Sequence, residues 1–281
     1  MTPRRQGRDF SRLHFPFTIS YNFTSHSRIA RRPFAPFSAT FRHPSRTMIK
    51  TVLFDLDDTL YAFPPTDQTG RNAVRDYAER VVGVDGKAFM DCFQEMLLLQ
   101  SRLHGDSAGC HSRAIRCQLV CEKMGISIRH AAVMNDIFWN TYLDSISPFP
   151  GIPELFAAIR ANGMKIGICT NMTADWQLKK LAKLGLADLC DFLVSSEEAA
   201  AEKPDRAIFE LCREKAGCRA EECLFIGDNP ICDIQGALDA GMQGLWLVHK
   251  PEALARHPGL PFVTAPDQIA ARIGLELPAG H

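Results

Sequence analysis

The spacing of apolar residues divides this chain of 281 residues into regions of different character. A short apolar run at 51–54 (TVLF) is typical of a buried strand. Apolar residues then recur every three or four positions, which predicts amphipathic helices over 67–82, 87–103, 112–124 and 131–146. From Pro148 onward, further apolar runs predict strands at 165–171, 191–196, 223–228 and a last one at 244–249. The helical patterns between these runs cover 174–184, 204–216 and 231–240.

Repeated strand–helix units with short connections are the pattern of a parallel sheet covered by helices on both faces. The fold class that we predict is therefore α/β. The core takes residues 48–62 and 148–281, and the helical block at 63–147 interrupts it after the first strand. We expect that block to be an inserted helical domain.

The formal net charge of zero hides an asymmetry along the chain. Residues 1–47 carry nine arginines, no lysine and a single acid, Asp9. The whole chain has 32 basic and 32 acidic residues, so the remainder holds 23 basic and 31 acidic ones, a balance of −8. A nucleic-acid partner is disfavoured, since proteins that bind nucleic acids usually present a basic face. No uncharged apolar run of 18 residues or more occurs, so we expect no transmembrane helix and no membrane partner.

Residues 1–47 have the acid-poor, arginine-rich composition of a transit peptide. The expected strand begins directly after Met48, which favours the alternative that Met48 is the true start and the upstream stretch a mis-annotated extension. In either case we expect little order there. The ten cysteines are scattered, which favours reduced thiols and a cytoplasmic location. An organelle is the alternative if the leader is genuine.

Polar and reactive residues stand directly after four of the expected strands. Ligands bind beyond the carboxyl ends of strands in open α/β sheets, so these residues should meet in one crevice. A buried carboxylate needs a hydrogen bond or a cation, so packing alone gives no reason for acids at the end of an apolar strand. The strand ends carry Asp55, Asp57 and Asp58; Thr170 and Asn171; Ser195 and Ser196, with Lys203 shortly after; and Asp228. Carboxylates at 55, 57 and 228 would form an oxygen-rich site for Mg2+, and Lys203 would supply a fixed positive charge.

Four motifs in this order resemble the haloacid dehalogenase superfamily, and in particular its phosphohydrolases of the nucleotidase and small-metabolite phosphatase branch. The motifs are DLDDTL at 55–60, the strand-ending Thr170, Lys203 in EKPD, and GDNPICDIQGA at 227–237. The resemblance covers residues 48–250. It implies a Rossmann-like core and makes the inserted helices at 63–147 a small cap domain of the subfamily I type.

The resemblance also implies a role for each matching residue. Asp55 would be the nucleophile that forms an aspartyl-phosphate, and Asp57 the general acid and base. Both can face the phosphoryl group only if the chain curls after the strand. Thr170 and the Asn171 backbone N–H would bind phosphoryl oxygens, and Lys203 would neutralise the nucleophile and the transferring group.

Mg2+ would be held by the Asp55 side chain, the Asp57 backbone carbonyl and Asp228. For Asp233, pairing with Lys203 or with a metal-bound water is as plausible as direct ligation. Asn229 could equally be a turn residue. Asp58 and Thr59 could brace the turn, and for Asp58 we favour that role over catalysis.

The implied function is Mg2+-dependent hydrolysis of a small phosphomonoester, a nucleoside monophosphate or a sugar phosphate, through an aspartyl-phosphate. Asp57 argues against a dehalogenase, because halide leaves without needing a proton. The alternatives are a phosphomutase of the same superfamily, similar to beta-phosphoglucomutase, and a non-catalytic regulatory protein. The cap offers five polar residues that could touch a substrate, although each would more often be a solvated helix charge: Arg71, Arg75, Arg102, His104 and Arg113. The sequence does not fix the oligomeric state.

Overall fold

The structure is a computed structural model that describes residues 48–105 and 107–277. The expectations for residues 1–47, a leader or an extension, lie outside the described residues. Within the two described ranges, every helix is too short or too polar to span a membrane.

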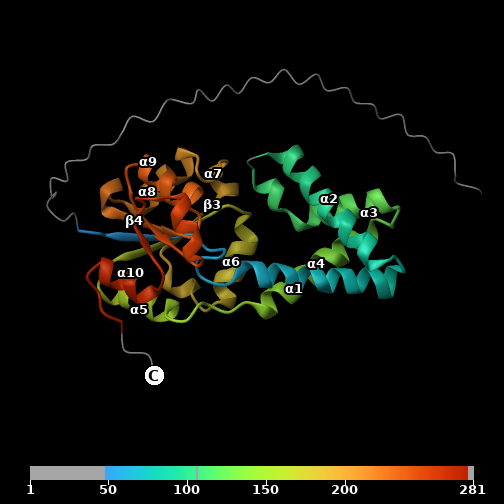
Figure 1. Ribbon diagram of the computed structural model, residues 1–281, viewed down its shortest axis with the longest axis horizontal. Coiled ribbons are helices and arrows are strands. Elements are labelled where there is room, and N and C mark those ends of the chain that lie inside the picture. Colours follow the sequence, from blue (N-terminus) through green and yellow to red (C-terminus); the bar gives the residue numbers. More distant parts are fainter. Residues whose placement is uncertain (1–47, 106, 278–281) are drawn as a thin grey trace, which may run out of the picture. The chain divides into compact units, whose positions relative to one another are not determined.

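The described residues form one sheet of six parallel strands in the order β3-β2-β1-β4-β5-β6 (Figure 1). The strands are β1 (Thr51–Phe54), β2 (Lys165–Thr170), β3 (Phe192–Ser195), β4 (Cys223–Gly227), β5 (Gln243–Leu247) and β6 (Phe262–Val263). The first strand of the chain therefore lies in the middle of the sheet, between β2 and β4. The prediction that β5 is the last strand is wrong: β6 pairs with β5, and its two residues are too few to show a strand pattern in the sequence.

Helices cover both faces of this sheet, as Figure 1 shows. Val52 and Phe54 of β1 pack in one apolar cluster with α5 (Ile152–Ala161) and α10 (Pro266–Arg272). Leu53 points the other way, into a cluster with α8 (Arg206–Ala216) and α9 (Gly236–Asp239). Because β1 is buried on both faces, its sequence is continuously apolar rather than alternating. The α/β fold class is confirmed.

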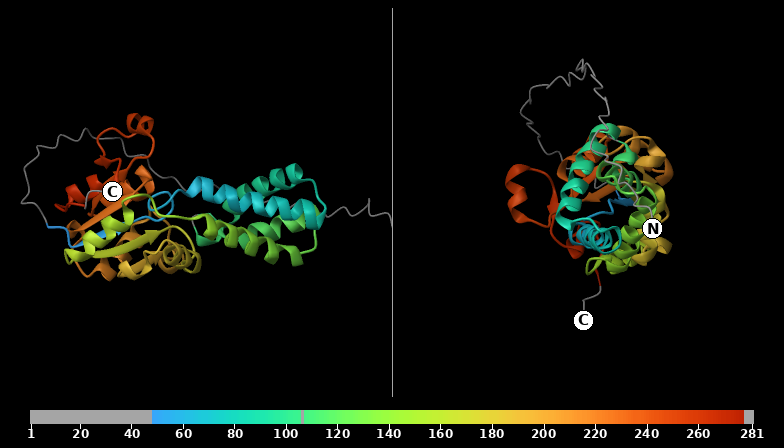
Figure 2. Two further views of the ribbon diagram at one scale, coloured as in Figure 1. Left: turned by 90° about the horizontal axis from the view of Figure 1, so that it is seen from below. Right: turned by 90° about the vertical axis from the view of Figure 1, so that its right-hand side faces the viewer.

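The first four of the five α-helices between β1 and β2 pack side by side as a bundle (Figures 1 and 2). They are α1 (Phe63–Tyr77), α2 (Gly86–His104), α3 (Arg113–Met124) and α4 (Arg129–Ser145). The helix predicted over 67–82 begins four residues earlier, because Pro64 and Pro65 occupy its first turn, where a missing N–H costs nothing. Its last part, Ala78–Val82, is a π-helical turn that ends at Gly83, whose φ is 81°.

The remaining elements are two further helices and several short turns. The helices are α6 (Ala174–Lys183) and α7 (Ser196–Ala199). Short 3-10 turns lie at Ala108–His111, Ala187–Leu189, Ala220–Glu222 and Pro251–Arg256, and a second π-helical segment lies at Pro230–Gln235. That segment and α9 together form the helix predicted over 231–240.

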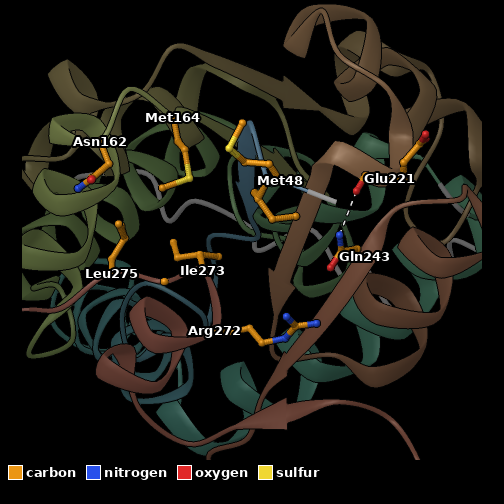
Figure 3. Close-up of a pocket in the computed structure, with 10 residues that line it drawn as sticks. Met48, Asn162, Met164, Glu221, Gln243, Arg272, Ile273 and Leu275 are labelled. Carbon is orange, nitrogen blue, oxygen red and sulfur yellow. Dashed lines mark hydrogen bonds between the residues drawn. The ribbon is translucent and has the colours of Figure 1, made fainter. Parts of the chain in front are cut away.

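A pocket of about 880 Å³ lies at the amino ends of the strands (Figure 3). The pocket is lined by Met48, Met164 and Gln243, which precede or begin β1, β2 and β5. Arg272 and Leu275 also line it. The polar residues singled out in the sequence follow the opposite, carboxyl ends of the strands. This pocket is therefore separate from the candidate site.

Candidate active site

The carboxyl ends of the central strands bring together residues that are far apart in the sequence. Lys203 Nζ lies 2.6 Å from Asp55 Oδ1, although 148 positions separate the two residues. Both side chains are buried. Parallel pairing of β1 with β2 and of β2 with β3 brings them together, since it sets the carboxyl ends of these strands at one edge of the sheet and Lys203 follows β3.

Three oxygen atoms hold the ammonium group of Lys203, and the Asn171 side chain holds its backbone. Its Nζ donates to Asp55 and to the Cys169 carbonyl at 2.9 Å, and it pairs with Asp233 Oδ1 at 2.7 Å. The side chain of Asn171 accepts from the Lys203 N–H at 2.7 Å and donates to the Lys203 carbonyl at 3.0 Å. The Asn171 side chain therefore fixes the lysine, and only its backbone N–H is left for the phosphate role that the sequence suggested.

Asp55 and Asp233, which pair with this lysine, form a cluster with a third carboxylate, Asp228. Asp55, Asp228 and Asp233 each offer an oxygen, and these oxygens lie within 4.8 Å of one another. Burial raises the pKa of Asp228 to about 8, and the charges of Asp55 and Asp233 add to that effect. Burial likewise raises the pKa of Asp55 to about 7 despite the opposing charge of Lys203. One ammonium group thus does not neutralise three acids.

This donor set fits a divalent cation such as Mg2+. The donors are carboxylate oxygens, which hard cations prefer, and their negative charge exceeds the positive charge that the described residues supply nearby. Gly227, just before Asp228, makes room for one of these carboxylates, because a Cβ there would lie 2.3 Å from Asp233 Oδ2.

The chain curls immediately after β1, as the proposed joint action of Asp55 and Asp57 requires. The Leu60 N–H donates to the Leu56 carbonyl at 3.0 Å, and the Thr59 hydroxyl donates to Asp55 Oδ2 at 3.3 Å. The same hydroxyl accepts from the Asp228 N–H at 3.1 Å, which ties the β1 and β4 loops together. Asp58 takes the left-handed conformation, with φ 62°, and its carboxylate accepts from the Phe63 N–H. Thr59 and Asp58 are thus placed as braces of the turn.

Asp57 has a lysine of its own, which sequence analysis missed. Lys180 Nζ of α6 lies 2.6 Å from Asp57 Oδ1, and the Tyr61 hydroxyl donates to the same oxygen. Gln177 Nε2 donates to Asp57 Oδ2 at 3.2 Å and to Thr170 Oγ1 at 2.6 Å. Burial alone would raise the pKa of Asp57, but the charge of Lys180 and these hydrogen bonds outweigh it and hold the pKa below its usual value.

A signal for these residues was present in the sequence. Gln177, Lys180, Leu181 and Leu184 are all buried and follow the spacing i, i+3, i+4, i+7 along α6 and its end. A glutamine and a lysine on the buried stripe of an amphipathic helix have to be paired inside the protein. The expected partner of such a lysine is a carboxylate, and here it is Asp57.

The helical bundle touches the site at two places. The hydroxyl of Tyr142 in α4 is hydrogen-bonded to that of Tyr61, and Trp139 stacks on Trp176 of α6 with ring centroids 4.1 Å apart. On the other side, His111 Nε2 lies 2.9 Å from Glu202 Oε1, next to Lys203. Burial would lower the pKa of His111, but hydrogen bonds to Cys110 and Glu202 outweigh it and raise the pKa to about 9.

The polar residues of the bundle have different surroundings. Arg113 is buried and its Nη2 lies 2.8 Å from Asp67 Oδ1, and Arg71 binds the same carboxylate. Arg75 pairs with Asp76 near the surface, Arg102 is exposed, and His104 is half-buried. The interpretation of Arg113 as a solvated helix charge is therefore wrong. Arg116, which is 1 % exposed, was missed altogether.

The two remaining predicted residues follow β4. Asp233 pairs with Lys203, one of the options left open, and its Oδ2 accepts from the Asn229 N–H at 2.9 Å. The Asn229 side chain accepts from the Ile231 and Cys232 N–H groups at 3.0 and 2.9 Å. Asn229 thus caps the helical turn that carries Asp233, which agrees with a turn residue.

The family model of haloacid dehalogenase-like hydrolases matches residues 49–241. The chain is 34 % identical over 199 residues to the ribulose-1,5-bisphosphate 5-phosphatase of Halopiger xanaduensis. The aligned residues cover 70 % of this chain and 83 % of that protein. The chain is also 30 % identical over 214 residues to the pyrimidine 5'-nucleotidase YjjG of Escherichia coli. This alignment covers 73 % of this chain and 90 % of that protein.

Among solved structures, the fold is similar to that of a phosphatase of this superfamily from Thermococcus onnurineus. The TM-score is 0.65 at 23 % identity, over 82 % of this chain and 100 % of the other. The motifs, the sheet and these relatives agree, and the resemblance inferred from the four motifs is confirmed. The chain belongs to the haloacid dehalogenase-like hydrolase family, as a phosphoric monoester hydrolase.

Proposed function

We propose that this protein is a Mg2+-dependent phosphatase that hydrolyses a small phosphomonoester through an aspartyl-phosphate on Asp55. The observation that carries the proposal is the group of three carboxylate oxygens within 4.8 Å, with Lys203 2.6 Å from Asp55. A cluster of this kind, at the carboxyl ends of parallel strands, suits a phosphoryl group, whose charge needs cations around it.

The first half-reaction transfers the phosphoryl group to the enzyme. Asp55 attacks phosphorus with one carboxylate oxygen, and the ester P–O bond breaks as the new P–O bond forms. Asp57 gives its proton to the departing alcohol oxygen. Lys203 offsets the negative charge that collects around Asp55, while Thr170 and the Asn171 N–H are available to the phosphoryl oxygens.

The second half-reaction returns the enzyme to its starting state. Asp57, now ionised, takes a proton from a water molecule, and the oxygen of that water attacks phosphorus and displaces the Asp55 carboxylate. The lowered pKa of Asp57 suits this step, because it favours the ionised, proton-accepting form. A bound phosphate ester adds negative charge beside Asp57 and so favours the protonated form that the first step requires.

Mg2+ would be held by the side chains of Asp55 and Asp228 and by the Asp57 backbone carbonyl, with Asp233 close by. When bound, the ion supplies positive charge for the phosphoryl oxygens and keeps Asp55 ionised. The relatives are named for a sugar phosphate and for nucleotides, which supports a substrate of one of these two classes.

Asp55→Asn tests the proposal. The amide is nearly isosteric, and Lys203 keeps Asp233 and the Cys169 carbonyl, so the fold should persist. Phosphate release should fall below about 1 % of the wild-type rate, since losing a nucleophile usually costs several orders of magnitude. Asp58→Asn is the matched control, with the same chemical change three positions away, and should stay near the wild-type rate.

The assay is release of inorganic phosphate from a panel of nucleotides and sugar phosphates. In parallel, acid-quenched wild type and Asp57→Asn are examined for protein-bound phosphate. Substantial phosphate release by Asp55→Asn would contradict the proposed aspartyl-phosphate on Asp55. A mutase would move the phosphoryl group within a sugar phosphate instead of releasing it, and product analysis separates that outcome.

A further inference from the structure

Four buried polar atoms in the described part of the chain have no hydrogen-bond partner. They are Arg113 Nε, Arg116 Nη1, Trp139 Nε1 and Gln177 Oε1. Buried polar atoms are almost always hydrogen-bonded, so each such exception needs an explanation. Three of the four are donors, and these three belong to helices α3 and α4 of the bundle.

Three of these four residues, Arg113, Trp139 and Gln177, lie in one region. The guanidinium carbon of Arg113 lies 5.7 Å from the centre of the Trp139 ring, and Lys180 Nζ lies 5.7 Å from the same ring. Lys180 and Gln177 both bind the Asp57 carboxylate. The region therefore runs from α3 across α4 to Asp57.

The same region has an excess of positive charge. Arg71 and Arg113 share the single carboxylate of Asp67. Arg116 donates to Gln100 Oε1 at 3.0 Å and to the Cys110 carbonyl at 3.5 Å, but none of the described carboxylates pairs with it. A buried cation without a counter-charge is strongly disfavoured. Burial and the neighbouring arginines lower the pKa of Arg116 to about 9.

The position beside Asp57 indicates which part of a substrate would come here. Asp57 is the group proposed to protonate the departing alcohol, whereas Asp55, Lys203 and Thr170 are proposed to contact the phosphoryl group. Gln177, which bonds to both Thr170 and Asp57, stands between the two sides. Donors on the far side of Asp57 would therefore meet the alcohol part of the ester.

We propose that Arg113 and Trp139, supported by the charge of Arg116, form a recognition site for an anionic group on the alcohol part of the substrate, a carboxylate or a second phosphate. This proposal deepens the proposed function and rests on it. An anion would accept hydrogen bonds from the Arg113 Nε–H and the Trp139 Nε1–H. It would also supply negative charge, because Asp67 is the only carboxylate among the described residues that pairs with Arg71, Arg113 or Arg116. The preferred substrates are then doubly anionic phosphomonoesters rather than neutral alcohol phosphates.

The test compares three phosphate esters with the same three-carbon skeleton. Glycerol 3-phosphate has a neutral alcohol part, 3-phosphoglycerate carries a carboxylate, and glycerol 1,3-bisphosphate carries a second phosphate. The wild-type protein with Mg2+ should show a kcat/KM at least about tenfold higher for one or both anionic esters, the factor expected for a hydrogen bond to a charged group. Whichever anionic ester has the higher kcat/KM shows whether the site prefers a carboxylate or a second phosphate.

The variant is Arg113→Met, which removes the guanidinium and leaves Asp67 paired with Arg71. It should lower kcat/KM for the preferred anionic ester about tenfold or more, while glycerol 3-phosphate changes less than about twofold. The ratio between two substrates measured on one preparation does not depend on how much of the protein is folded. Arg75→Met is the matched control, because this bundle arginine pairs with Asp76 near the surface, and its ratio should stay that of the wild type.

The outcomes separate this proposal from the function on which it rests. A wild-type preference for glycerol 3-phosphate, or an equal loss on all three esters in Arg113→Met, would overturn the recognition site while phosphatase activity stands. If none of the esters nor the nucleotide panel releases phosphate, the proposed function itself fails. A ratio that shifts equally in Arg75→Met would mean that the charge of the bundle as a whole, and not this site, attracts the anion.

Discussion

Lys180→Met tests the surroundings of Asp57 most directly. Lys180 Nζ lies 2.6 Å from Asp57 Oδ1, its side chain is 1 % exposed, and no second carboxylate of the described residues pairs with it. After the substitution, Tyr61 and Gln177 still bind the carboxylate, but the cation that fixes and neutralises it is gone. We expect a folded protein in which Asp57 is poorly placed for proton transfer.

The structure sets the size of two effects. Removing one partner of a fully buried ion pair costs about 3–5 kcal/mol, and the lower end applies here because the Asp57 side chain is 23 % exposed. A positioned general acid contributes about 10²–10⁴ to a rate. Because two of the three hydrogen-bonding partners remain, we expect to lose about one or two of those powers of ten on an alkyl phosphate.

The assay compares kcat/KM for glycerol 3-phosphate and for p-nitrophenyl phosphate on the same preparation. p-Nitrophenolate leaves without a proton, so its rate should fall much less than that of the alkyl ester. Lys179→Met is the matched control, since the neighbouring lysine is 48 % exposed and pairs only with Asp175 among the described carboxylates. Lys180→Arg keeps the charge and should restore part of the ratio. Equal losses on both substrates would refute the positioning role and leave Lys180 a purely structural residue.

Three further outcomes follow from the same geometry. Excess chelator should abolish phosphate release and lower Tm, and Mg2+ should restore both, because the crowded carboxylates are then compensated; full activity in chelator would contradict the metal site. Gly227→Ala should cost about 1–3 kcal/mol and most of the activity, since its Cβ would lie 2.3 Å from Asp233 Oδ2 and push that carboxylate off Lys203. His111 has a pKa of about 9 against an ordinary 6.5, so its pair with Glu202 stabilises the fold fully below pH 6.5, and this stabilisation is lost as the pH rises through about 9. His111→Gln should therefore lower Tm more at about pH 6 than at about pH 10, and an equal shift at both would contradict that assignment.

The sequence predicted the sheet and the reactive strand ends because both depend on short-range pattern. An apolar run followed by Asp55, or one followed by Thr170, marks a strand end whatever surrounds it. Parallel pairing then determines that the ends meet. The two-residue β6 gave no such pattern, and only its pairing with β5 defines it.

The residues that were missed lie on helices, where polar side chains are usually solvated. On α3 the buried stripe is Arg113, Arg116, Cys117, Val120 and Cys121, so two arginines occupy core positions. The spacing alone puts them there, but their partners come from α1 and α2, and the sequence does not show which helix faces which. The same holds for Lys180, whose partner Asp57 lies 123 positions away.

The contacts of the bundle connect it to Asp55 and Asp57. Each of these two aspartates has its own lysine, Lys203 for Asp55 and Lys180 for Asp57. The bundle touches the core beside each lysine: Tyr142 bonds to Tyr61, which holds Asp57, and His111 pairs with Glu202, the neighbour of Lys203. A shift of the bundle would therefore disturb the surroundings of Asp55, the proposed nucleophile, and of Asp57, the proposed acid–base group, together. Arg113 and Lys180 lie near the same Trp139 ring, so the proposed reader of the alcohol and the proposed proton donor Asp57 would be placed by the same contacts.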